Sequence, residues 1–455
     1  MSRLRPSLLQ KLGIKYPIIQ SPMAGVLTPA MAASVTNAGG LGSLPISTIN
    51  FTLPNSITQL QALIDSYNSN LVDESKTNTI NLNFFCHEIE QPPTESQILN
   101  WKKLYIEATN LPKSVIDEIE CTKNGNVSFR EFEQNSEAFD RLMSYLSKYR
   151  PKIISFHFGI PQRSTIDKLK QLGIMVFITA TSVEEVNQVI KVGGEVDGVV
   201  LQGYEAGGHR GNFLTGVVDA KLPTWDLFQL VKKELNQLDT HNKSSSSSSS
   251  TASASAEAEA SRPPPYLVVA GGIMNSSQAQ RFLDAGADAV QLGTAFLGTV
   301  ESNTSGYFSK VSQDGPSTVM TALISGKPAR AVVTDFIARI EQERKLEKAT
   351  KSGAIKNKDG DGNGDGDGDV NVNIDVNGEL PPYGYAYAAY KQLKDIVGKK
   401  QQQNPKQKET CGNEASLDLG FYLAGLGYKQ IEKDVGNGEK LTTQQVIDKL
   451  ISELK

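Results

Sequence analysis

The sequence is poor in the residues that build metal and disulfide sites. It has three cysteines, Cys86, Cys121 and Cys411, and four histidines among its 455 residues. The cysteines lie far apart and form no Cys-x-x-Cys pair, so neither a disulfide scaffold nor a zinc site is expected. A sparse and odd set of cysteines is typical of reduced thiols inside a cell.

Long apolar runs and an excess of basic charge are also missing. No apolar run reaches the roughly 20 residues that a membrane-spanning helix needs. The net charge of −4 gives no basic field for nucleic acid or an anionic membrane. Neither nucleic acid nor a membrane is therefore expected as a partner. We expect a monomer or homodimer that acts on small molecules.

The N-terminus leaves two locations open. Met1–Lys15 carries four basic residues and no acid occurs before Asp65, as in some mitochondrial presequences. However, the first expected strand begins at Pro17, which leaves little chain to cleave. A cytoplasmic location is expected over a mitochondrial one.

What the sequence does contain is a series of short apolar segments bounded by glycine, proline or polar residues. They are continuous rather than alternating, as is typical of strands buried on both faces of a parallel sheet. The expected strands are Pro17–Gln20, Leu41–Leu44, Thr79–Phe85, Lys152–His157, Ile174–Thr179, Asp197–Gln202, Tyr266–Ala270 and Asp288–Leu292. With helix-length segments between them, they predict an α/β fold, a (β/α)8 TIM barrel. An open doubly wound sheet is the alternative.

Helices are expected between the strands and beyond them. Those in the barrel include Pro29–Asn37, Arg163–Leu172, Val183–Val192 and Ser276–Ala285, the last with Ser276 as a suitable N-cap. The barrel is predicted to span 1–297. Residues 298–455 are expected to form a helical appendage over the barrel mouth, with helices at Val311–Ser325, Thr334–Ala349, Tyr383–Val397 and Thr442–Leu454.

Two stretches of biased composition interrupt this pattern. The first, 243–265, contains seven consecutive serines, and the second, 351–378, is rich in glycine, aspartate and asparagine. Both are expected to be disordered insertions. The second begins like an EF-hand loop at Asp359, but its twelfth position is Val370 rather than the required glutamate. A hydrophilic linker is therefore the better interpretation, and no metal site is expected.

The loops after the seventh and eighth expected strands are suited to binding phosphate. They contain Gly271 and Gly272, and Gly293 followed by Thr294. Glycines expose backbone N–H groups, the threonine adds a hydroxyl, and a helix near Ser276 adds its positive end. Barrels commonly hold phosphate at these two loops. The sequence therefore predicts a phosphorylated cofactor.

The segment after the sixth strand is the most informative. It reads Gln202-Gly-Tyr-Glu-Ala-Gly-Gly-His-Arg-Gly211. Its glycines allow close approach to a ligand. Histidine is the side chain best suited to proton transfer near neutral pH, and a surface turn does not need Glu205, His209 and Arg210 together. We predict His209 as the catalytic residue.

Three further segments follow strand ends. Small residues at Met23, Ala24 and Gly25 would let a planar ring approach the turn after the first strand. Asn83 is equally suited to contact a ligand or to serve the structure, whereas Asn81 is expected to be structural. For His157, at the end of the fourth strand, pocket and structural roles are equally open.

These motifs together resemble the nitronate monooxygenase family, formerly called 2-nitropropane dioxygenases, and in particular its class I yeast and fungal members. The resemblance covers Tyr16 to Thr294 apart from the serine-rich insertion, and continues more weakly to the end. The motifs that carry it are Pro17-Ile-Ile-Gln-Ser-Pro-Met-Ala-Gly25, Asn81-Leu-Asn-Phe-Phe85, Ser155-Phe-His-Phe-Gly159, Gln202 to Phe213, Ala270-Gly-Gly-Ile273 and Gln291-Leu-Gly-Thr294.

The resemblance implies an FMN-dependent oxidoreductase that uses O₂ to oxidise alkyl nitronates, such as propionate 3-nitronate, to a carbonyl compound and nitrite, and so detoxifies nitro compounds. It identifies His209 as the catalytic histidine and Tyr387 as the aromatic residue of the substrate pocket. The FMN contacts that it implies are Pro22, Met23, Ala24, Asn83, Gln202, Gly207, Gly272, Gln291, Gly293 and Thr294.

The chain departs from the family at several places. Ser325-Gly-Lys-Pro-Ala-Arg330 has lysine where relatives have arginine, and Leu423-Ala-Gly-Leu426 ends in leucine rather than glutamine. These departures concern the choice of substrate more than the cofactor. Two other functions stay open: a flavin-dependent enoyl-acyl-carrier reductase that uses a nicotinamide donor, and a flavin-binding protein without catalysis.

Overall fold

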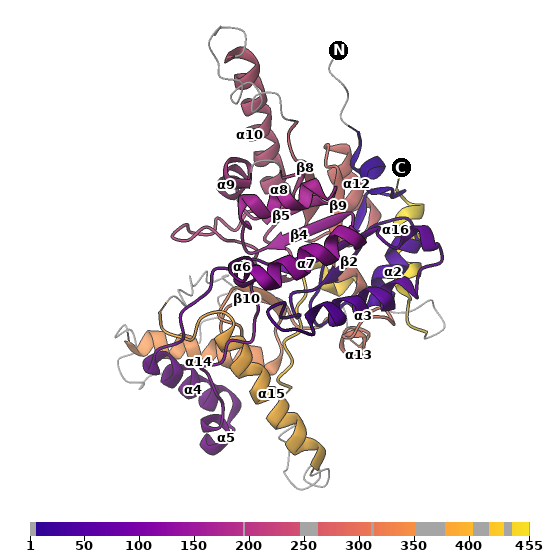
Figure 1. Ribbon diagram of the computed structural model, residues 1–455. Coiled ribbons are helices and arrows are strands. Elements are labelled where there is room, and N and C mark those ends of the chain that lie inside the picture. The colour runs from indigo at the N-terminus through magenta and orange to yellow at the C-terminus, as the bar shows by residue number, and fades with distance from the viewer. Residues whose placement is uncertain are drawn as a thin grey trace. The chain divides into compact units, whose positions relative to one another are not determined.

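The computed structural model describes residues 6–193, 196–245, 263–310, 314–351, 378–403, 418–431 and 439–454. The chain divides into two compact units. The barrel unit comprises Met1–Ile89, Val127–Gly315 and Ala424–Lys455, and the appended unit comprises Glu90–Asn126 and Pro316–Leu423. Each is described by itself below and can be followed by its labels in Figure 1.

The barrel unit is built on eight parallel strands in the order β1-β9-β8-β6-β5-β4-β3-β2. A parallel bridge between Ile19 and Leu41 joins β1 to β2, so the sheet closes on itself. The strands are β1 (Ile18–Gln20), β2 (Gly42–Pro45), β3 (Ile80–Phe85), β4 (Ile153–His157), β5 (Met175–Ala180), β6 (Gly198–Gln202), β8 (Tyr266–Ala270) and β9 (Ala289–Leu292). The predicted TIM barrel and all eight of its strands are confirmed.

Apolar residues bury both faces of this sheet. Phe177, Val200 and Val268 belong to one buried cluster together with Leu8 and Leu12 of α1 (Leu8–Leu12). Their neighbours along the strands belong to a second cluster with the surrounding helices. Burial on both faces explains why the strands are continuous apolar runs.

Helices connect the strands and surround them (Figure 1). They are α2 (Pro29–Asn37), α3 (Ser56–Asn68), α6 (Phe129–Gln134), α7 (Ser136–Tyr149), α8 (Arg163–Gln171), α9 (Val183–Gly193), α10 (Thr224–Ser245), α12 (Ser276–Asp284), α13 (Ser305–Phe308) and α16 (Thr443–Ser452), with short turns η1 (Glu74–Lys76), η2 (Thr294–Phe296) and η4 (Leu426–Gln430). The N-cap of α12 is Asn275, whose side chain accepts the N–H of Gln278, so the prediction of Ser276 was wrong by one residue.

In the residues that the structure describes, the appended unit contains helices and an antiparallel hairpin. Its elements are α4 (Glu95–Thr109), α5 (Lys113–Asp117), β10 (Thr318–Thr321), β11 (Ala329–Val332), α14 (Asp335–Lys351) and α15 (Tyr385–Gln403). Its core includes Trp101, Tyr105, Phe336 and Tyr390. The helices predicted near α14, α15 and α16 are confirmed.

Two predictions about this region differ from the structure. The helix predicted at Val311–Ser325 is wrong, because Thr318–Thr321 pairs as a strand with Ala329–Val332 across a turn in which Gly326 has a φ of 81°. The predicted boundary at 297 also differs. Glu90–Asn126, inserted after β3, belongs to the appended unit, whereas Ala424–Lys455 returns to the barrel unit.

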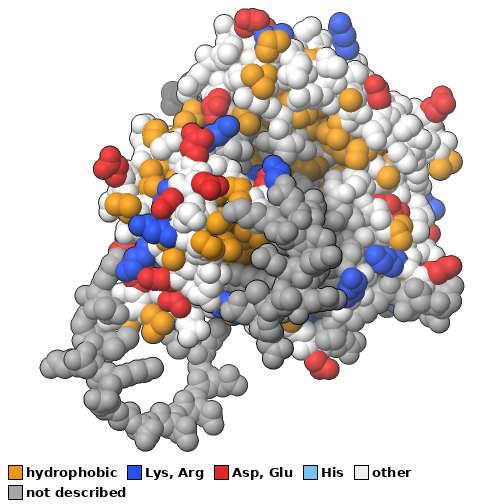
Figure 2. All heavy atoms as spheres, turned by 90° about the horizontal axis from the view of Figure 1, so that it is seen from below, with side chains coloured by type: hydrophobic (Ala, Val, Ile, Leu, Met, Phe, Trp, Pro, Cys, Tyr) orange, Lys and Arg blue, Asp and Glu red, His pale blue; other side chains and the backbone are white. Residues whose placement is uncertain are grey.

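Most of the two biased stretches, 243–265 and 351–378, including the EF-hand-like segment, lies outside the described residues. Within the described ranges, no helix combines the length and apolar character needed to cross a membrane. On the face in Figure 2, basic and acidic side chains are interspersed.

Candidate active site

Residues at the C-terminal ends of the barrel strands are partly accessible, although the strands that carry them are buried. Active sites of such barrels lie at this end. The predicted site residues with intermediate exposure are Pro22, Met23, Ala24, His157, Gly207, His209, Gly271, Gly272, Gln291, Gly293 and Thr294. They are therefore placed where a ligand could reach them.

Close backbone approaches bring the turns of four strands together. A Cβ at Gly293, after β9, would lie 3.1 Å from Ser21 Cβ and 3.3 Å from Met23 Sδ, in the turn after β1. A Cβ at Gly272, after β8, would lie 3.0 Å from Glu205 Cβ in the loop after β6. Gly272 also has a φ of 70°, which side chains rarely adopt. Both positions therefore favour glycine for packing, and Gly272 also for its backbone conformation.

A segment near the C-terminus completes this cluster. Gly207 packs against it so closely that a Cβ there would lie 2.4 Å from the carbonyl carbon of Ala424 and from the nitrogen of Gly425. The N–H of Gly425 also donates to Thr294 Oγ1 at 3.0 Å. Because this hydroxyl accepts from Gly425, its own proton remains to donate elsewhere. This contact was not predicted from the sequence, where the segment stands out only as a departure from relatives.

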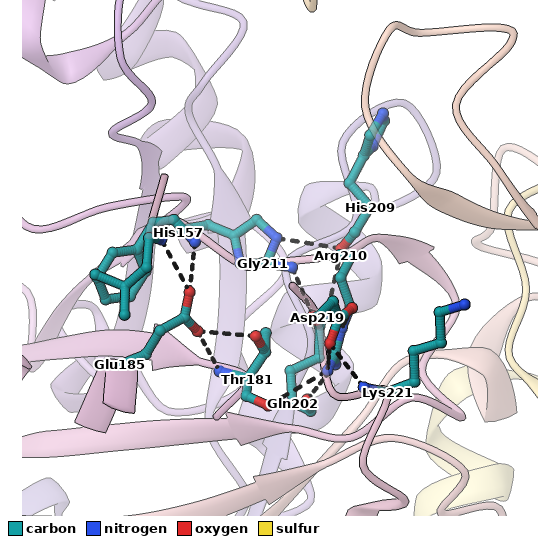
Figure 3. Close-up of polar contacts among 11 residues, drawn as sticks. His157, Thr181, Glu185, Gln202, His209, Arg210, Gly211, Asp219 and Lys221 are labelled. Carbon is teal, nitrogen blue, oxygen red and sulfur yellow. Dashed lines mark hydrogen bonds and ion pairs between the residues drawn. The ribbon is translucent and has the colours of Figure 1, made fainter. Parts of the chain in front are cut away.

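The loop that carries His209 includes the short strand β7 (Gly208–His209) and is held by the side chain of Gln202, which is 9% exposed. Its Nε2 donates to the carbonyl oxygen of His209 at 3.1 Å, and its Oε1 accepts the N–H of Gly211 at 2.7 Å. In Figure 3, the His209 ring points away from the buried polar residues beneath the loop. The backbone is thus braced while the ring projects from it.

Arg210 forms a second brace from inside the protein. Its guanidinium group donates to both oxygens of Asp219, at 2.8 and 3.0 Å, and to the carbonyl oxygen of Gln202 at 2.6 Å. Partial burial by itself would raise the pKa of Asp219, but the hydrogen bonds and charge of Arg210 outweigh it and hold that pKa below its ordinary value. Arg210 is 2% exposed, so its contribution is structural.

Glu205 also has a structural partner. Its carboxylate accepts the N–H and the hydroxyl of Thr224, both at 2.7 Å, at the start of α10. Thr224 Oγ1 also lies 3.0 Å from the carbonyl oxygen of Gly271, in the turn after β8. From the sequence, Glu205 and Arg210 were predicted to be signs of chemistry together with His209. The structure separates their roles. The side chains of Glu205 and Arg210 fix the loop, and the ring of His209 projects from it.

Glu185 on α9 is a further brace that the sequence analysis missed. It is 2% exposed, and its Oε2 accepts the N–H and hydroxyl of Thr181 at 2.7 and 2.8 Å. Its Oε1 accepts the N–H groups of Phe213 and Leu214, at 2.5 and 3.3 Å. A glutamate in the first turn of a helix reads as an ordinary helix-terminus residue, so the sequence carries little signal for this contact.

Comparison with known proteins identifies the family. The profile of the nitronate monooxygenase family matches residues 5–377. A Saccharomyces cerevisiae protein named "Putative nitronate monooxygenase" is 39% identical over 436 residues, which cover 95% of this chain and 90% of that protein. The nitronate monooxygenase of Paraburkholderia phytofirmans is 34% identical over 350 residues, covering 76% and 81% of the two chains.

The chain belongs to the nitronate monooxygenase family. It is accordingly an oxidoreductase, as predicted. The fold agrees, because the structure of nitroalkane oxidase from Streptomyces ansochromogenes superposes with a TM-score of 0.63 over 99% of this chain and 98% of that one, at 21% identity.

Within the barrel, two predicted site residues are less exposed than the rest. Asn83, 2% exposed, donates through Nδ2 to Ser155 Oγ at 2.9 Å, which gives its amide a partner inside the barrel. Gln202 is occupied by the His209 loop, as described above. His157 lies at the end of β4 with its Nε2 3.4 Å from the carbonyl oxygen of His209.

Tyr387 lies on α15 of the appended unit. Its ring stacks on Tyr390 at 6.2 Å between centroids, and Lys391 Nζ lies 4.1 Å from its ring centre. Burial raises the pKa of the Tyr387 hydroxyl above its ordinary value. Its role in a substrate pocket stays a prediction.

Proposed function

We propose that this member of the nitronate monooxygenase family binds FMN and uses O₂ to oxidise alkyl nitronates of the propionate 3-nitronate type to a carbonyl compound and nitrite. The observation that carries the proposal is the partly exposed His209 loop, braced by buried side chains and packed directly on the glycine turn after β8. In the net reaction, two nitronate ions and one O₂ give two carbonyl compounds and two nitrite ions. A role in detoxifying nitro compounds would follow.

The turns after β8 and β9 fit the phosphate of FMN. Gly271 and Gly272 have φ angles of 120° and 70°, so the backbone there can turn its N–H groups toward an anion. Thr294 begins the turn η2, where the first N–H groups have no partner within the turn. Its hydroxyl accepts from Gly425 and keeps a proton to donate. These groups would hold the phosphate without a charged side chain.

The turn after β1 fits the flavin ring. Ser21 to Ala24 is partly exposed, and Pro22 leaves one position without a backbone donor. The close approach of Gly293 to Met23 places this turn beside the proposed phosphate loop. Pro22, Met23 and Ala24 would line the ring, with Gly207 and Gln291 at partly exposed positions around it. We assign Asn83 and Gln202 to the floor beneath it, since both are buried.

Electron transfer from the nitronate to O₂ is the chemistry that FMN would supply when bound at these turns. The protein has to bind the substrate against the ring, manage its charge and exclude side reactions. His209 as an imidazolium would bind the nitronate oxygens, and as a neutral base it would remove a proton from a neutral nitroalkane. A nitronate anion has no such proton to lose, so for that substrate the main task of His209 is to bind and orient charge.

The test is to purify the full chain, measure its FMN content from the absorbance spectrum, and follow O₂ uptake and nitrite release with propionate 3-nitronate. His209→Asn should retain FMN and lower kcat/KM for a neutral nitroalkane by about 10²- to 10⁴-fold, the usual contribution of a positioned base. Full turnover by His209→Asn with both nitronate and nitroalkane would remove His209 from the mechanism. A colourless protein that cannot be reconstituted with FMN would overturn the whole proposal.

The same preparation separates the two other functions. Oxidation of NADPH without any nitronate would favour the enoyl-acyl-carrier reductase. A folded, FMN-loaded protein with no turnover of any nitro compound would favour a non-catalytic flavin-binding role. His209 argues against the latter, because binding FMN does not require a histidine that projects from a braced loop.

A further inference from the structure

Phe158, directly after β4, has an unusual backbone conformation. Its φ is +72°, in the left-handed region that bulky side chains rarely occupy. Four described non-glycine residues have positive φ: Asn110, Arg150, Phe158 and Lys221. Asn110 and Arg150 end helices, and Lys221 lies in a loop. Phe158 is the buried one, at 3% exposure. Such strain persists only where the surroundings enforce it, and it is often linked to function.

The ends of β3 and β4 enforce this conformation. The N–H of Cys86 donates to the carbonyl oxygen of His157 at 2.8 Å. Gly159 passes so close to Cys86 that a Cβ there would lie 2.2 Å from its carbonyl oxygen. Arg130 donates to the carbonyl oxygens of both Cys86 and Ile160, each at 3.4 Å. The chain on both sides of Phe158 is therefore fixed to β3.

The strained backbone places the Phe158 ring among three of the four histidines of the chain. Its ring centre lies 4.2 Å from that of His157, 6.0 Å from that of His209 and 6.3 Å from that of His87. The contact with His209 is edge-to-face, with the planes at 90°. Edge-to-face aromatic contacts favour one relative orientation of the two rings.

We propose that Phe158 is a positioning residue that holds the imidazole rings of His209 and His157 in the orientation that the substrate meets. The backbone strain is the cost of placing its ring there. Gln202 and His157 contact the backbone carbonyl of His209, whereas Phe158 contacts the ring itself and limits its rotation. The catalytic part of this inference rests on the function proposed above, whereas the orientation of the rings does not.

The test uses two variants and one matched control. Phe158→Leu keeps an apolar side chain without the aromatic edge, and Phe158→Gly removes the ring and the strain together. The control is Phe156→Leu, two residues earlier, where the ring packs against Phe84 and Phe129. All three are examined as full-length, FMN-loaded protein, with melting temperatures to compare their stability.

With propionate 3-nitronate, both Phe158 variants should lower kcat/KM by tenfold to about a hundredfold, as expected for a displaced catalytic group. Phe156→Leu should lower the melting temperature but leave kcat/KM within about twofold, because the ring of Phe156 packs on Phe84 and Phe129. Wild-type kcat/KM in Phe158→Gly, or an equal loss in Phe156→Leu, would overturn the proposal.

A second measurement does not depend on activity. The chain has four histidines, so ¹⁵N-histidine labelling gives four imidazole spin systems. The variants His157→Asn and His209→Asn identify the signals of these two residues. The titration midpoints of His157 and His209 should change in both Phe158 variants and match wild type in Phe156→Leu. Unchanged midpoints would overturn the positioning role. If wild-type protein oxidises no nitronate, the proposed function fails, and this measurement still decides whether Phe158 orients the rings.

Discussion

Nε2 of His157 lies 3.4 Å from the backbone carbonyl oxygen of His209. Through this contact, the ring of His157 at the end of β4 is joined to the backbone of His209 in the loop after β6. The same carbonyl oxygen accepts the Gln202 amide at 3.1 Å. His157 therefore contributes to holding His209, whatever else it contacts.

Replacing His157 with phenylalanine should weaken catalysis without releasing the cofactor. The ring volume is kept, but the donor to the His209 carbonyl is lost, so we expect kcat/KM for a nitronate to fall by about tenfold. The measurement is steady-state O₂ uptake beside the FMN content. His157→Gln, which keeps a donor, should recover part of the loss. A rise in KM alone with unchanged kcat would point instead to direct substrate binding by His157.

Gln202→Leu should destabilise the barrel and loosen the loop. The change leaves the carbonyl oxygen of His209 and the N–H of Gly211 without this partner, which costs about 1–3 kcal/mol per buried group. Urea unfolding of the two proteins measures the difference. Gln61→Leu is the control, since Gln61 is exposed and bonds to Asp65 on the surface of α3. Equal stability of Gln202→Leu and wild type would show that water replaces the amide.

The sequence was sufficient to predict the barrel because its signals are local. Each strand is a continuous apolar run, and each run is bounded by glycine or a polar residue. The roles of Glu185 and Arg210 could not be predicted in this way, because each depends on contacts with residues at other places in the fold, such as Leu214 and Asp219. The hairpin around Gly326 was missed because a short apolar run is compatible with either a strand or a helix. The insertion Glu90–Asn126 was missed because assignment to a unit depends on packing rather than on order along the chain.

The Arg210–Asp219 pair should make stability depend on pH in acid. The folded protein holds the pKa of Asp219 below its ordinary value, so the unfolded chain binds the proton more readily. The stabilisation is complete above the unfolded pKa of about 3.9 and is lost as pH falls through the lower folded value. Asp219→Asn should remove this component. Unfolding free energies of wild type and variant should therefore converge as pH falls below about 4.

The control for this experiment is Asp448→Asn, which changes an exposed carboxylate on α16. Asp448→Asn should show the same decrease in unfolding free energy with falling pH as wild type. A difference between Asp219→Asn and wild type that stays constant from neutral pH to the acid limit would contradict the prediction. In that case the variant would have lost packing or hydrogen bonds, and the charge of Asp219 would not matter.

Gly207→Ala should separate the C-terminal segment from the cofactor site. The new methyl group would meet the carbonyl carbon of Ala424 and the nitrogen of Gly425, both at 2.4 Å, and these are backbone atoms that cannot move aside alone. If Ala424–Gly425 is displaced, the hydrogen bond from Gly425 to Thr294 is lost as well. Since Thr294 is proposed to bind phosphate, we expect FMN binding to weaken by about tenfold, which corresponds to about 1.4 kcal/mol of binding free energy. Fluorescence titration of apoprotein with FMN measures this affinity.

Gly306→Ala is the matched control, because a Cβ at Gly306 meets no atom within 4 Å. Unchanged FMN affinity in Gly207→Ala would mean that the Ala424–Gly425 segment does not support the phosphate site.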